Sequence, residues 1–183
     1  MVMSIDLSEK VIGKLPIFSG SRISLSEYQI LSPNGVQSTR HIVEHPQAVV
    51  VVPVTHESKF LLIRQFRTAA GRVLVEVPAG VLNVGEDPEV GAQRELREET
   101  GFRAGRLKKL FSGFPTPGFC TEYMHFYLAT HLVWDPLDPD VDEIIEPFVV
   151  GINDIKEMIA SDSINDVKTL LGLLAGMSEV VVS

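Results

Sequence analysis

Three glutamates, Glu95, Glu98 and Glu99, stand close together in the stretch RELREETG. In a helix they would occupy positions i, i+3 and i+4, so that their carboxylates share one face. Like charges at these spacings destabilise an isolated helix by about 0.2–0.5 kcal/mol per pair. On a partly desolvated face the repulsion is larger, about 3 kcal/mol at 5 Å and an effective dielectric near 20. The cluster is therefore either a cation site or a solvated acidic face, which is a common feature of helices.

The residues on either side predict that the glutamates do lie on a helix. Asp87 can cap its N-terminus, and Pro88 follows at the first helical position, where a missing N–H does no harm. Gly101 stands where a left-handed residue commonly ends a helix. Gly91 falls on the same side as the glutamates, and we expect its missing side chain to let another group approach that face.

The loop before this helix brings a fourth acid to the same region. Gly80 ends a predicted strand, and Glu86 follows six residues later, so four acids converge around one helix face and its entry loop. Hard divalent cations prefer oxygen ligands, and Mg²⁺ usually takes one or two carboxylates together with waters and substrate phosphates. A bound metal would turn the repulsion between the glutamates into attraction. Arg94 and Arg97 can also neutralise part of the face.

Composition limits what such a site can serve. The 183 residues suit one globular domain, and a formal net charge of −8 disfavours duplex DNA or an anionic membrane as a partner. Cys120 is the only cysteine, which excludes an intrachain disulfide and favours the cytoplasm. No apolar run approaches the ~20 residues of a membrane span, and the N-terminus lacks signal-peptide features. A phosphate-bearing substrate would need local help from cations.

The elements that must position the acids are mostly strands, ending in two helices. Alternating or continuous apolar runs predict strands at residues 22–31, 36–45, 48–54, 59–67, 72–80, 107–114, 124–134 and 146–151. Helical spacing follows at residues 152–161 and 165–177, and each helix has an asparagine near its start that can cap it. We expect a mixed or α+β sheet with helices packed on it.

From Gly80 to Phe102 the chain reads Gly, five residues, Glu, seven residues, then Arg-Glu-Leu-x-Glu-Glu-x-Gly-Phe. This pattern resembles the Nudix box of the Nudix hydrolases at every fixed position. The resemblance implies an α/β protein with the Nudix α/β/α sandwich, a mixed sheet between helices, and an N-terminal β-hairpin region. It also implies hydrolysis of a nucleoside diphosphate linked to another group, dependent on Mg²⁺ or Mn²⁺.

The same resemblance assigns roles to the box residues. It implies that Glu95 and Glu99 are metal ligands, and that Glu98 binds the metal directly or through water. The carbonyl of Ala79 is an additional ligand in similar proteins. Arg94 would orient the glutamates. Glu86 would brace the loop against the helix.

Other stretches resemble the ADP-ribose pyrophosphatase branch of that family. They are VEHPQAVVVVPV, IRQFR and LVEVPAG, at residues 43–54, 63–67 and 74–80, and a proline in FPTPGFCTE sixteen residues after Gly101. The expected substrate-binding residues are Arg22, Arg64, Arg67, Glu76 and Pro117. Arg67 has the strongest physical case, because a guanidinium holds a diphosphate through paired hydrogen bonds. The alternatives are a plain turn for Pro117 and edge-strand charges for the two arginines of IRQFR.

One departure from the branch concerns the adenine. Relatives often carry an aromatic residue after the arginine of the early strand, but here Ile23 follows Arg22. Phe18 and Tyr28 are the candidates to replace it. In this branch residues 1–45 would form a strand region within a homodimer interface, and residues 46–183 the Nudix domain, as one structural unit.

The resemblance to the ADP-ribose branch implies that the catalytic base lies in the acidic stretch of residues 138–150. Glu143 is favoured, because a loop acid can swing over a bound substrate, and Glu146 at the strand entrance is the alternative. A solvated loop is a third interpretation. For ADP-ribose the products would be AMP and ribose 5-phosphate. Rival functions are hydrolysis of GDP-mannose, ADP-glucose, NADH or another dinucleotide, and ADP-ribose binding without catalysis.

Overall fold

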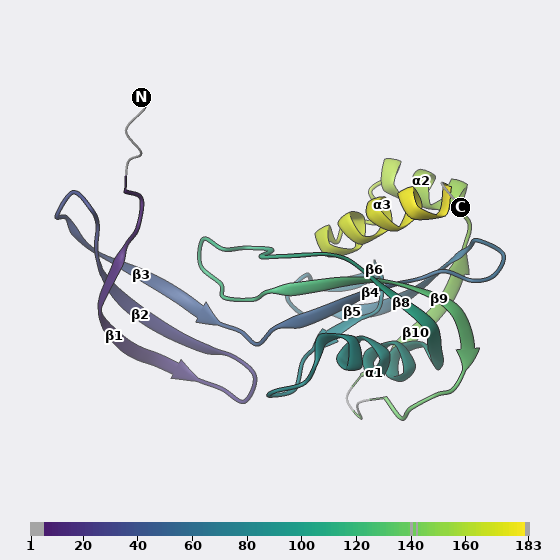
Figure 1. The fold of residues 1–183 in the computed structure, drawn as a ribbon, viewed down its shortest axis with the longest axis horizontal. Coiled ribbons are helices and arrows are strands. Elements are labelled where there is room, and N and C mark those ends of the chain that lie inside the picture. Colours follow the sequence, from purple (N-terminus) through teal and green to yellow (C-terminus); the bar gives the residue numbers. More distant parts are fainter. Residues whose placement is uncertain (1–5, 140, 142, 182–183) are drawn as a thin grey trace. The chain divides into compact units, whose positions relative to one another are not determined.

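The computed structural model describes residues 6–139, 141 and 143–181, and they form two compact units (Figure 1). One unit contains the chain up to Pro46 together with Phe114–Tyr123. The other contains Gln47–Gly113 and the chain from Met124 onward. No pattern in the sequence predicted that Phe114–Tyr123 would belong to the same unit as the N-terminal strands.

The N-terminal unit is built on an antiparallel sheet of three strands in the order β1-β2-β3. They span Lys10–Ser19, Ser24–Leu31 and Gln37–Glu44. The turn between β2 and β3 contains Gly35, which has φ 81°. Strand β1 was not predicted from the sequence, because it contains Gly13 and Pro16, and its pairing with β2 is interrupted near both.

Phe114–Tyr123 joins this unit through backbone contacts to the end of β3. Val43 N donates to Phe119 O at 2.7 Å, and Thr121 N donates to Val43 O at 3.0 Å. The Thr121 hydroxyl also accepts from His45 N at 2.9 Å. The segment therefore completes the hydrogen bonding of a strand more than 70 residues earlier in the chain.

The second unit holds two sheets. The order in the first is β7-β4-β9-β8, in which only β4 and β9 are parallel, and the order in the second is β10-β5-β6, all antiparallel. The strands are β4 Ala48–Pro53, β5 Phe60–Arg67, β6 Arg72–Glu76, β7 Ala79–Val81, β8 Phe102–Gly113, β9 Met124–Trp134 and β10 Ile145–Val150. The single strand predicted at residues 72–80 is in fact two. Pro78 interrupts it, since it has no N–H for a ladder, although its carbonyl accepts from Val51 N at 2.8 Å.

Three helices belong to this unit: α1 Pro88–Thr100, α2 Ile152–Ala160 and α3 Val167–Val181. The predicted ends of α1 are confirmed. Asp87 accepts hydrogen bonds from Glu89 N and Val90 N, and Gly101 has φ 77°. Among the described residues, no helix is both long enough and apolar enough to cross a bilayer.

The asparagine caps predicted for the last two helices are wrong. Helix α2 follows Gly151 without a side-chain cap. At α3 the capping oxygen belongs to Asp166, which accepts from Thr169 N at 3.0 Å. Asn165 instead donates its amide to Asp162 O at 3.1 Å.

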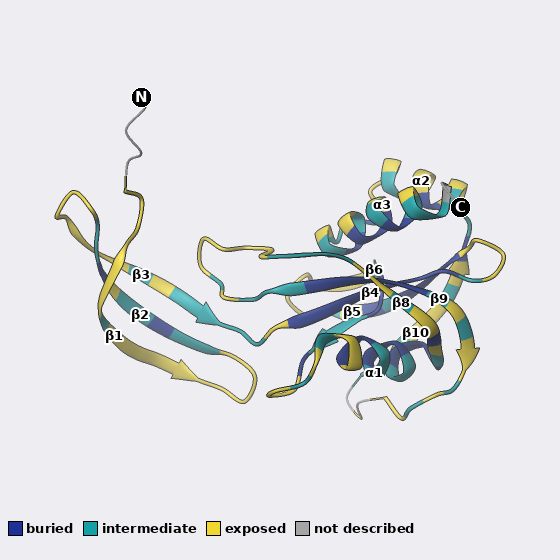
Figure 2. Ribbon diagram, viewed as in Figure 1, coloured by how far each residue is buried: buried dark blue, intermediate teal, exposed yellow. Residues whose placement is uncertain are grey.

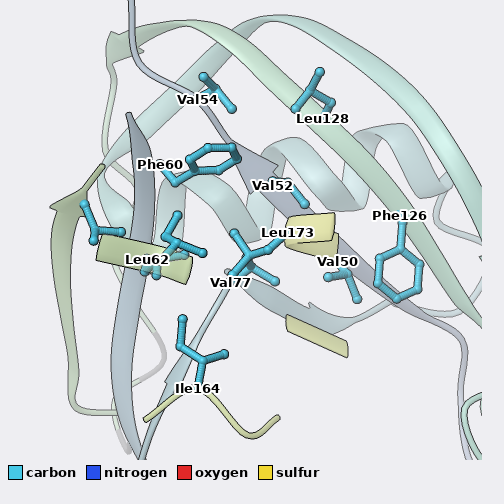
Figure 3. Close-up of a cluster of buried hydrophobic side chains, with 12 residues drawn as sticks. Val50, Val52, Val54, Phe60, Leu62, Val77, Phe126, Leu128, Ile164 and Leu173 are labelled. Carbon is cyan, nitrogen blue, oxygen red and sulfur yellow. The ribbon is translucent and has the colours of Figure 1, made fainter. Parts of the chain in front are cut away.

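Helix α1 covers one face of the sheets and α3 the other (Figure 1). Strand β4 is buried along its whole length (Figure 2), and its alternate side chains serve the two faces. Val49 and Val51 pack with Leu96 of α1. Val50 and Val52 pack with Leu173 of α3 in the cluster that Figure 3 shows. This double burial explains the continuous apolar run in the sequence, and it confirms the expected sandwich.

Candidate functional site

Two of the box glutamates are almost fully buried on α1. Glu95 is 8% exposed and Glu99 is 6% exposed. Burial raises the pKa of Glu95 to about 7, opposed by Arg94 and reinforced by the charges of Glu98 and Glu143. Burial, followed by the charge of Glu95, raises the pKa of Glu99 well above its usual value, and Glu143 adds to this too. Glu143 therefore lies within electrostatic reach of both carboxylates.

Arg94 is the internal counter-charge of the acidic face. Its Nε and Nη2 each donate to Glu86 at 2.9 Å, one to either oxygen. Its Nη1 donates to Glu95 at 2.6 Å and to Glu98 at 2.9 Å. These contacts raise the pKa of Arg94, and the Arg94 hydrogen bonds lower the pKa of Glu86 to about 2. Arg97 plays no part here, because it binds Asp135 through its backbone and side-chain oxygens.

Hydrogen bonds to Glu86 fix the conformation of the loop that precedes α1. Glu86 Oε2 accepts from Asn83 N at 2.8 Å and from the Asn83 amide at 3.2 Å. Arg94 reaches the same loop through Val81 O at 3.0 Å. Loop and helix are therefore joined by one carboxylate and one guanidinium, the arrangement that the resemblance implied for Glu86 and Arg94.

Two glycines of the box create space inside the site. A Cβ at Gly80 would lie 2.1–2.3 Å from the carboxylate atoms of Glu95, so only glycine leaves that carboxylate room. A Cβ at Gly91 would lie 2.2 Å from Leu82 Cδ2. The group that approaches the helix at Gly91 is thus a side chain of the chain's own loop.

The donor set on α1 suits a hard divalent cation. Glu99 accepts a hydrogen bond from Ala79 N at 3.0 Å, which places the start of β7 beside the carboxylate. Three box carboxylates, Glu86, Glu95 and Glu98, share the single guanidinium of Arg94, and Glu99 lies beside Glu95 and Glu98 on the same helix face. Within the described residues, no three acid, histidine or cysteine side chains already converge on one metal position. Binding would therefore draw these oxygens together from the arrangement that Arg94 holds.

Arg67 and Glu76 form a two-pronged ion pair between β5 and β6. Arg67 Nε donates to Glu76 Oε1 at 2.7 Å and Nη2 donates to Oε2 at 2.8 Å. Burial raises the pKa of the fully buried Glu76, but Arg67 and Lys168 outweigh it and lower that pKa below the usual value. The Glu76 hydrogen bond raises the pKa of Arg67, and the charge of Glu99 adds to this, so Arg67 lies within electrostatic reach of Glu99 on α1.

Arg64 and Glu146 pair with each other. They face one another across β5 and β10 at 3.1 Å, and Arg64 also lies 4.0 Å from the ring centre of Phe148. The Glu146 side chain is 70% exposed. Arg64 and Arg67 are three positions apart, so their side chains leave opposite faces of β5. Within the described residues, the ion pair that Arg64 and Glu146 each make is with one another and not with an α1 acid.

Pro117 and Arg22 belong to the N-terminal unit. Pro117 is exposed in a turn in which Thr116 O accepts from Phe119 N and Cys120 N. Arg22 is exposed between β1 and β2. Of the two aromatic candidates, Phe18 is more than half exposed, whereas the Tyr28 hydroxyl donates to Glu44.

Sequence reasoning missed two polar residues next to these groups. Lys168 of α3 donates to the Glu76 carboxylate, and no local pattern could reveal a contact spanning 92 residues. Gln65 lies two residues before Arg67 on the same face of β5, and its buried Oε1 has no hydrogen-bond partner among the described residues. Such an oxygen costs about 1–3 kcal/mol, which a donor from water or a ligand would offset. The sequence did contain a signal for Gln65: side chains alternate between the two faces of a strand, so Gln65 and Arg67 of IRQFR were expected on the same face.

Comparisons with known proteins identify the family of this chain. A family model described as NUDIX domain matches residues 44–168. The ADP-ribose pyrophosphatase of Bacillus subtilis (strain 168) is 42% identical over 165 residues, which cover 89% of each chain. The methanol dehydrogenase activator of Bacillus methanolicus is 37% identical over 167 residues, 90% of each chain.

A crystal structure of an ADP compounds hydrolase superimposes with a TM-score of 0.86, covers 97% of both chains and is 20% identical. At that identity the match shows the fold alone. The family model covers more than half of the chain and includes all of α1 and its entry loop. The chain therefore belongs to the Nudix family.

Proposed function

We propose that this protein hydrolyses the diphosphate bond of ADP-ribose to AMP and ribose 5-phosphate, with Mg²⁺ or Mn²⁺ as cofactor. The observation that carries the proposal is the buried pair Glu95 and Glu99, held on α1 beside the start of β7. The similarity to the Bacillus subtilis ADP-ribose pyrophosphatase over 89% of both chains supports the substrate. The single cysteine supports a cytoplasmic location.

Nudix hydrolases generally use a divalent metal. The residues that would hold it here are Glu95, Glu98 and Glu99, with the carbonyl of Ala79. When bound, it neutralises phosphate charge and lowers the pKa of a coordinated water. Arg94 keeps two of these carboxylates oriented through its Nη1 contacts.

The rest of the reaction falls to side chains beyond the box. We assign the general base to Glu143, which removes the proton of the attacking water. Its charge reaches both Glu95 and Glu99, whereas Glu146 is occupied by Arg64. Arg67 would bind the diphosphate through its Nη1, since its other two nitrogens hold Glu76.

The remaining candidates contribute to the substrate site less directly. Glu76 is fully buried and would act through Arg67. Arg22, Arg64 and Pro117 stay proposals for binding the nucleotide or the terminal ribose. Among the aromatic candidates, the exposed Phe18 is better placed to stack on an adenine than Tyr28, whose hydroxyl is engaged by Glu44.

We also propose a homodimer formed through the N-terminal unit, with residues 18–28 of one chain contributing to the partner's adenine site. Strand β1 exposes apolar side chains that water does not favour, namely Val11, Leu15, Ile17 and Phe18, each more than half exposed. A second copy of the chain would cover them. Burial of apolar area contributes about 25 cal/mol per Å².

The experiment that tests the function is a hydrolysis panel with purified protein. ADP-ribose, ADP-glucose, GDP-mannose, NADH and diadenosine polyphosphates are each offered with Mg²⁺ or Mn²⁺, and products are separated by chromatography. We expect ADP-ribose to give the highest kcat/KM, with AMP released. Glu99→Gln is the matched control and should lower turnover by about 10²–10⁴.

Two outcomes of the panel would overturn the substrate assignment. A higher kcat/KM for another nucleotide would make this a Nudix hydrolase of that compound. ADP-ribose binding measured by calorimetry, without turnover in either metal, would identify a binding module instead.

A further inference from the structure

A lysine of the C-terminal helix reaches the ion pair that holds Arg67. Lys168, in the first turn of α3, donates through Nζ to Glu76 Oε2. The same Nζ donates to Asp166 Oδ2 at 2.8 Å. The Glu76 carboxylate therefore accepts three charged hydrogen bonds, two from Arg67 and one from Lys168. Bonds between charged groups are about twice as strong as neutral ones.

The first turn of α3 is itself fixed against the end of β6. Asp166 Oδ2 accepts from the Thr169 hydroxyl at 2.6 Å and from Thr169 N at 3.0 Å. The Thr169 hydroxyl accepts from Val77 N at 3.0 Å, one residue past β6. Because Thr169 is completely buried, this joint between helix and strand has little freedom. Lys168 is consequently held in place on both sides.

Arg67, Glu76, Lys168 and Asp166 form one charged network, and only its Arg67 end is substantially exposed to solvent. Side-chain exposures are 0% for Glu76, 14% for Lys168, 18% for Asp166 and 36% for Arg67. Two cations and two carboxylates balance, so Arg67 can present its remaining nitrogen without leaving a buried charge uncompensated. If Lys168 lost its charge, Glu76 and Asp166 would share one cation. The grip of Glu76 on Arg67 would then loosen.

We propose that Lys168 is a positioning residue for substrate binding. It fixes the Glu76 carboxylate, and through that carboxylate it sets the orientation in which Arg67 receives the diphosphate of the substrate. The inference rests on the proposed function, because it names a further residue of that same site. Neither the Nudix box nor the strand motifs contain this lysine, which comes from α3.

The kinetic test is Lys168→Met. We expect KM for ADP-ribose to rise about tenfold and kcat to change less than about threefold, since the lost interaction is one of ground-state binding. Lys168→Arg, which keeps the charge and a donor, should restore most of the affinity. If Lys168→Met does not fold, Lys168→Gln takes its place, because it keeps a donor without the charge.

The matched control is Lys108→Met. Lys108 pairs with Glu179 at 2.5 Å near the other end of α3, so this variant also removes a lysine–glutamate bond to that helix. Its KM should stay within about twofold of wild type. An equal rise in KM in both variants would mean that loosening α3 is sufficient, and it would overturn the assignment.

A double-mutant cycle shows whether the lysine acts through Arg67. In the Arg67→Ala background, Lys168→Met should no longer raise KM, because the group that it positions is gone. If the two effects multiply instead, Lys168 contributes independently of Arg67 and the proposal is wrong.

A measurement without turnover separates this inference from the proposed function. The Arg67 Nε–H resonance, assigned in ¹⁵N spectra by its loss in Arg67→Lys, should move and exchange faster with water in Lys168→Met. If the wild type hydrolyses no nucleotide of the panel, the proposed function fails, while this resonance still reports on the positioning. An unchanged Nε–H signal in Lys168→Met would overturn the inference.

Discussion

A single guanidinium organises the acidic face of α1. Arg94 makes five hydrogen bonds, four to three carboxylates and one to Val81 O. The planar fork of arginine can serve several acceptors at fixed angles, which a lysine cannot imitate. Glu99 lies outside this set of contacts, and it is also the acid whose pKa burial raises most clearly. Among the described residues, three acids of this face are therefore bonded to a cation, and Glu99 has no directly bonded cation.

The two candidate bases are expected to behave differently. Glu143→Gln should lower kcat at pH 7 by about 10²–10⁴ while metal and ADP-ribose binding are nearly retained, because it removes a proton acceptor but little volume. Glu146→Gln should lose only the exposed pair with Arg64 and stay within about twofold. Steady-state kinetics and calorimetry on both variants provide the measurement. The reverse ranking would make Glu146 the base, and no effect in either would leave the role to Glu98 or to a metal-bound hydroxide.

Glu95 and Glu99 make the metal-free protein less stable at high pH. Their folded pKa values are raised, to about 7 for Glu95, so their stabilising contribution is present below about pH 4.5 and is lost as pH rises through 7. For Glu95 this amounts to a loss on the order of 2 kcal/mol between pH 5.5 and 8. The depressed pKa values of Glu76 and Glu86 act below this window.

The measurement is the melting temperature in EDTA at pH 5.5 and pH 8. His125, whose pKa burial lowers, acts in the opposite direction, so the informative quantity is the difference between wild type and Glu99→Gln. That difference should favour the variant at pH 8 by several degrees and shrink at pH 5.5 or on adding Mg²⁺. If the difference in melting temperature between wild type and Glu99→Gln did not depend on pH, repulsion between ionised Glu95 and Glu99 would be contradicted.

At the scale of elements, local signals were sufficient for α1 and insufficient for its surroundings. Asp87, Pro88 and Gly101 set the ends of the helix through contacts within a few residues, and these were predicted correctly. The division of the strand at Pro78 has a local cause too, the missing N–H of proline, although the prediction kept residues 72–80 as one strand. Lys168 was missed because its partner Glu76 is brought to it only by the packing of α3.

The close approach of β7 to α1 requires glycine at position 80, and this requirement can be tested. Gly80→Ala would place a methyl group 2.1–2.3 Å from the Glu95 carboxylate, so the carboxylate must move. We expect kcat/KM to fall about 10–100-fold and a higher Mg²⁺ concentration to be needed, since a displaced ligand weakens the metal site. Gly113→Ala is the control, because a Cβ there meets no atom within 4 Å. Equal activity of the two variants would exclude a role for Glu95 in metal binding.

For the whole molecule, a net charge of −8 opposes a substrate with two phosphates. Affinity must come from local positive groups, and Arg67, which lies within electrostatic reach of Glu99, is the one that we propose. The N-terminal sheet poses a second problem at this scale, because β1 leaves most of its residues exposed. A three-stranded sheet with exposed apolar side chains and an open edge tends to associate.

We expect a homodimer that Leu15→Asp combined with Ile17→Asp converts to monomer, since each charge would have to be buried in the interface. Light scattering coupled to gel filtration at micromolar concentration gives the mass. Activity of the double variant should fall as well, because the partner's adenine contacts are lost. A wild-type monomer with full activity would refute both the dimer and the shared site.

Phe114–Tyr123 connects β8 to β9 but belongs to the N-terminal unit, and this has a consequence for synthesis on the ribosome. The strand β3 is complete once residue 44 has emerged, but the groups that satisfy Val43 N and O belong to Phe119 and Thr121. The N-terminal unit therefore cannot acquire its full set of hydrogen bonds until about 75 further residues have been translated. During that interval β3 presents unsatisfied backbone groups, as an edge strand does. Chaperone demand for this protein should accordingly peak while the middle third of the chain is being made.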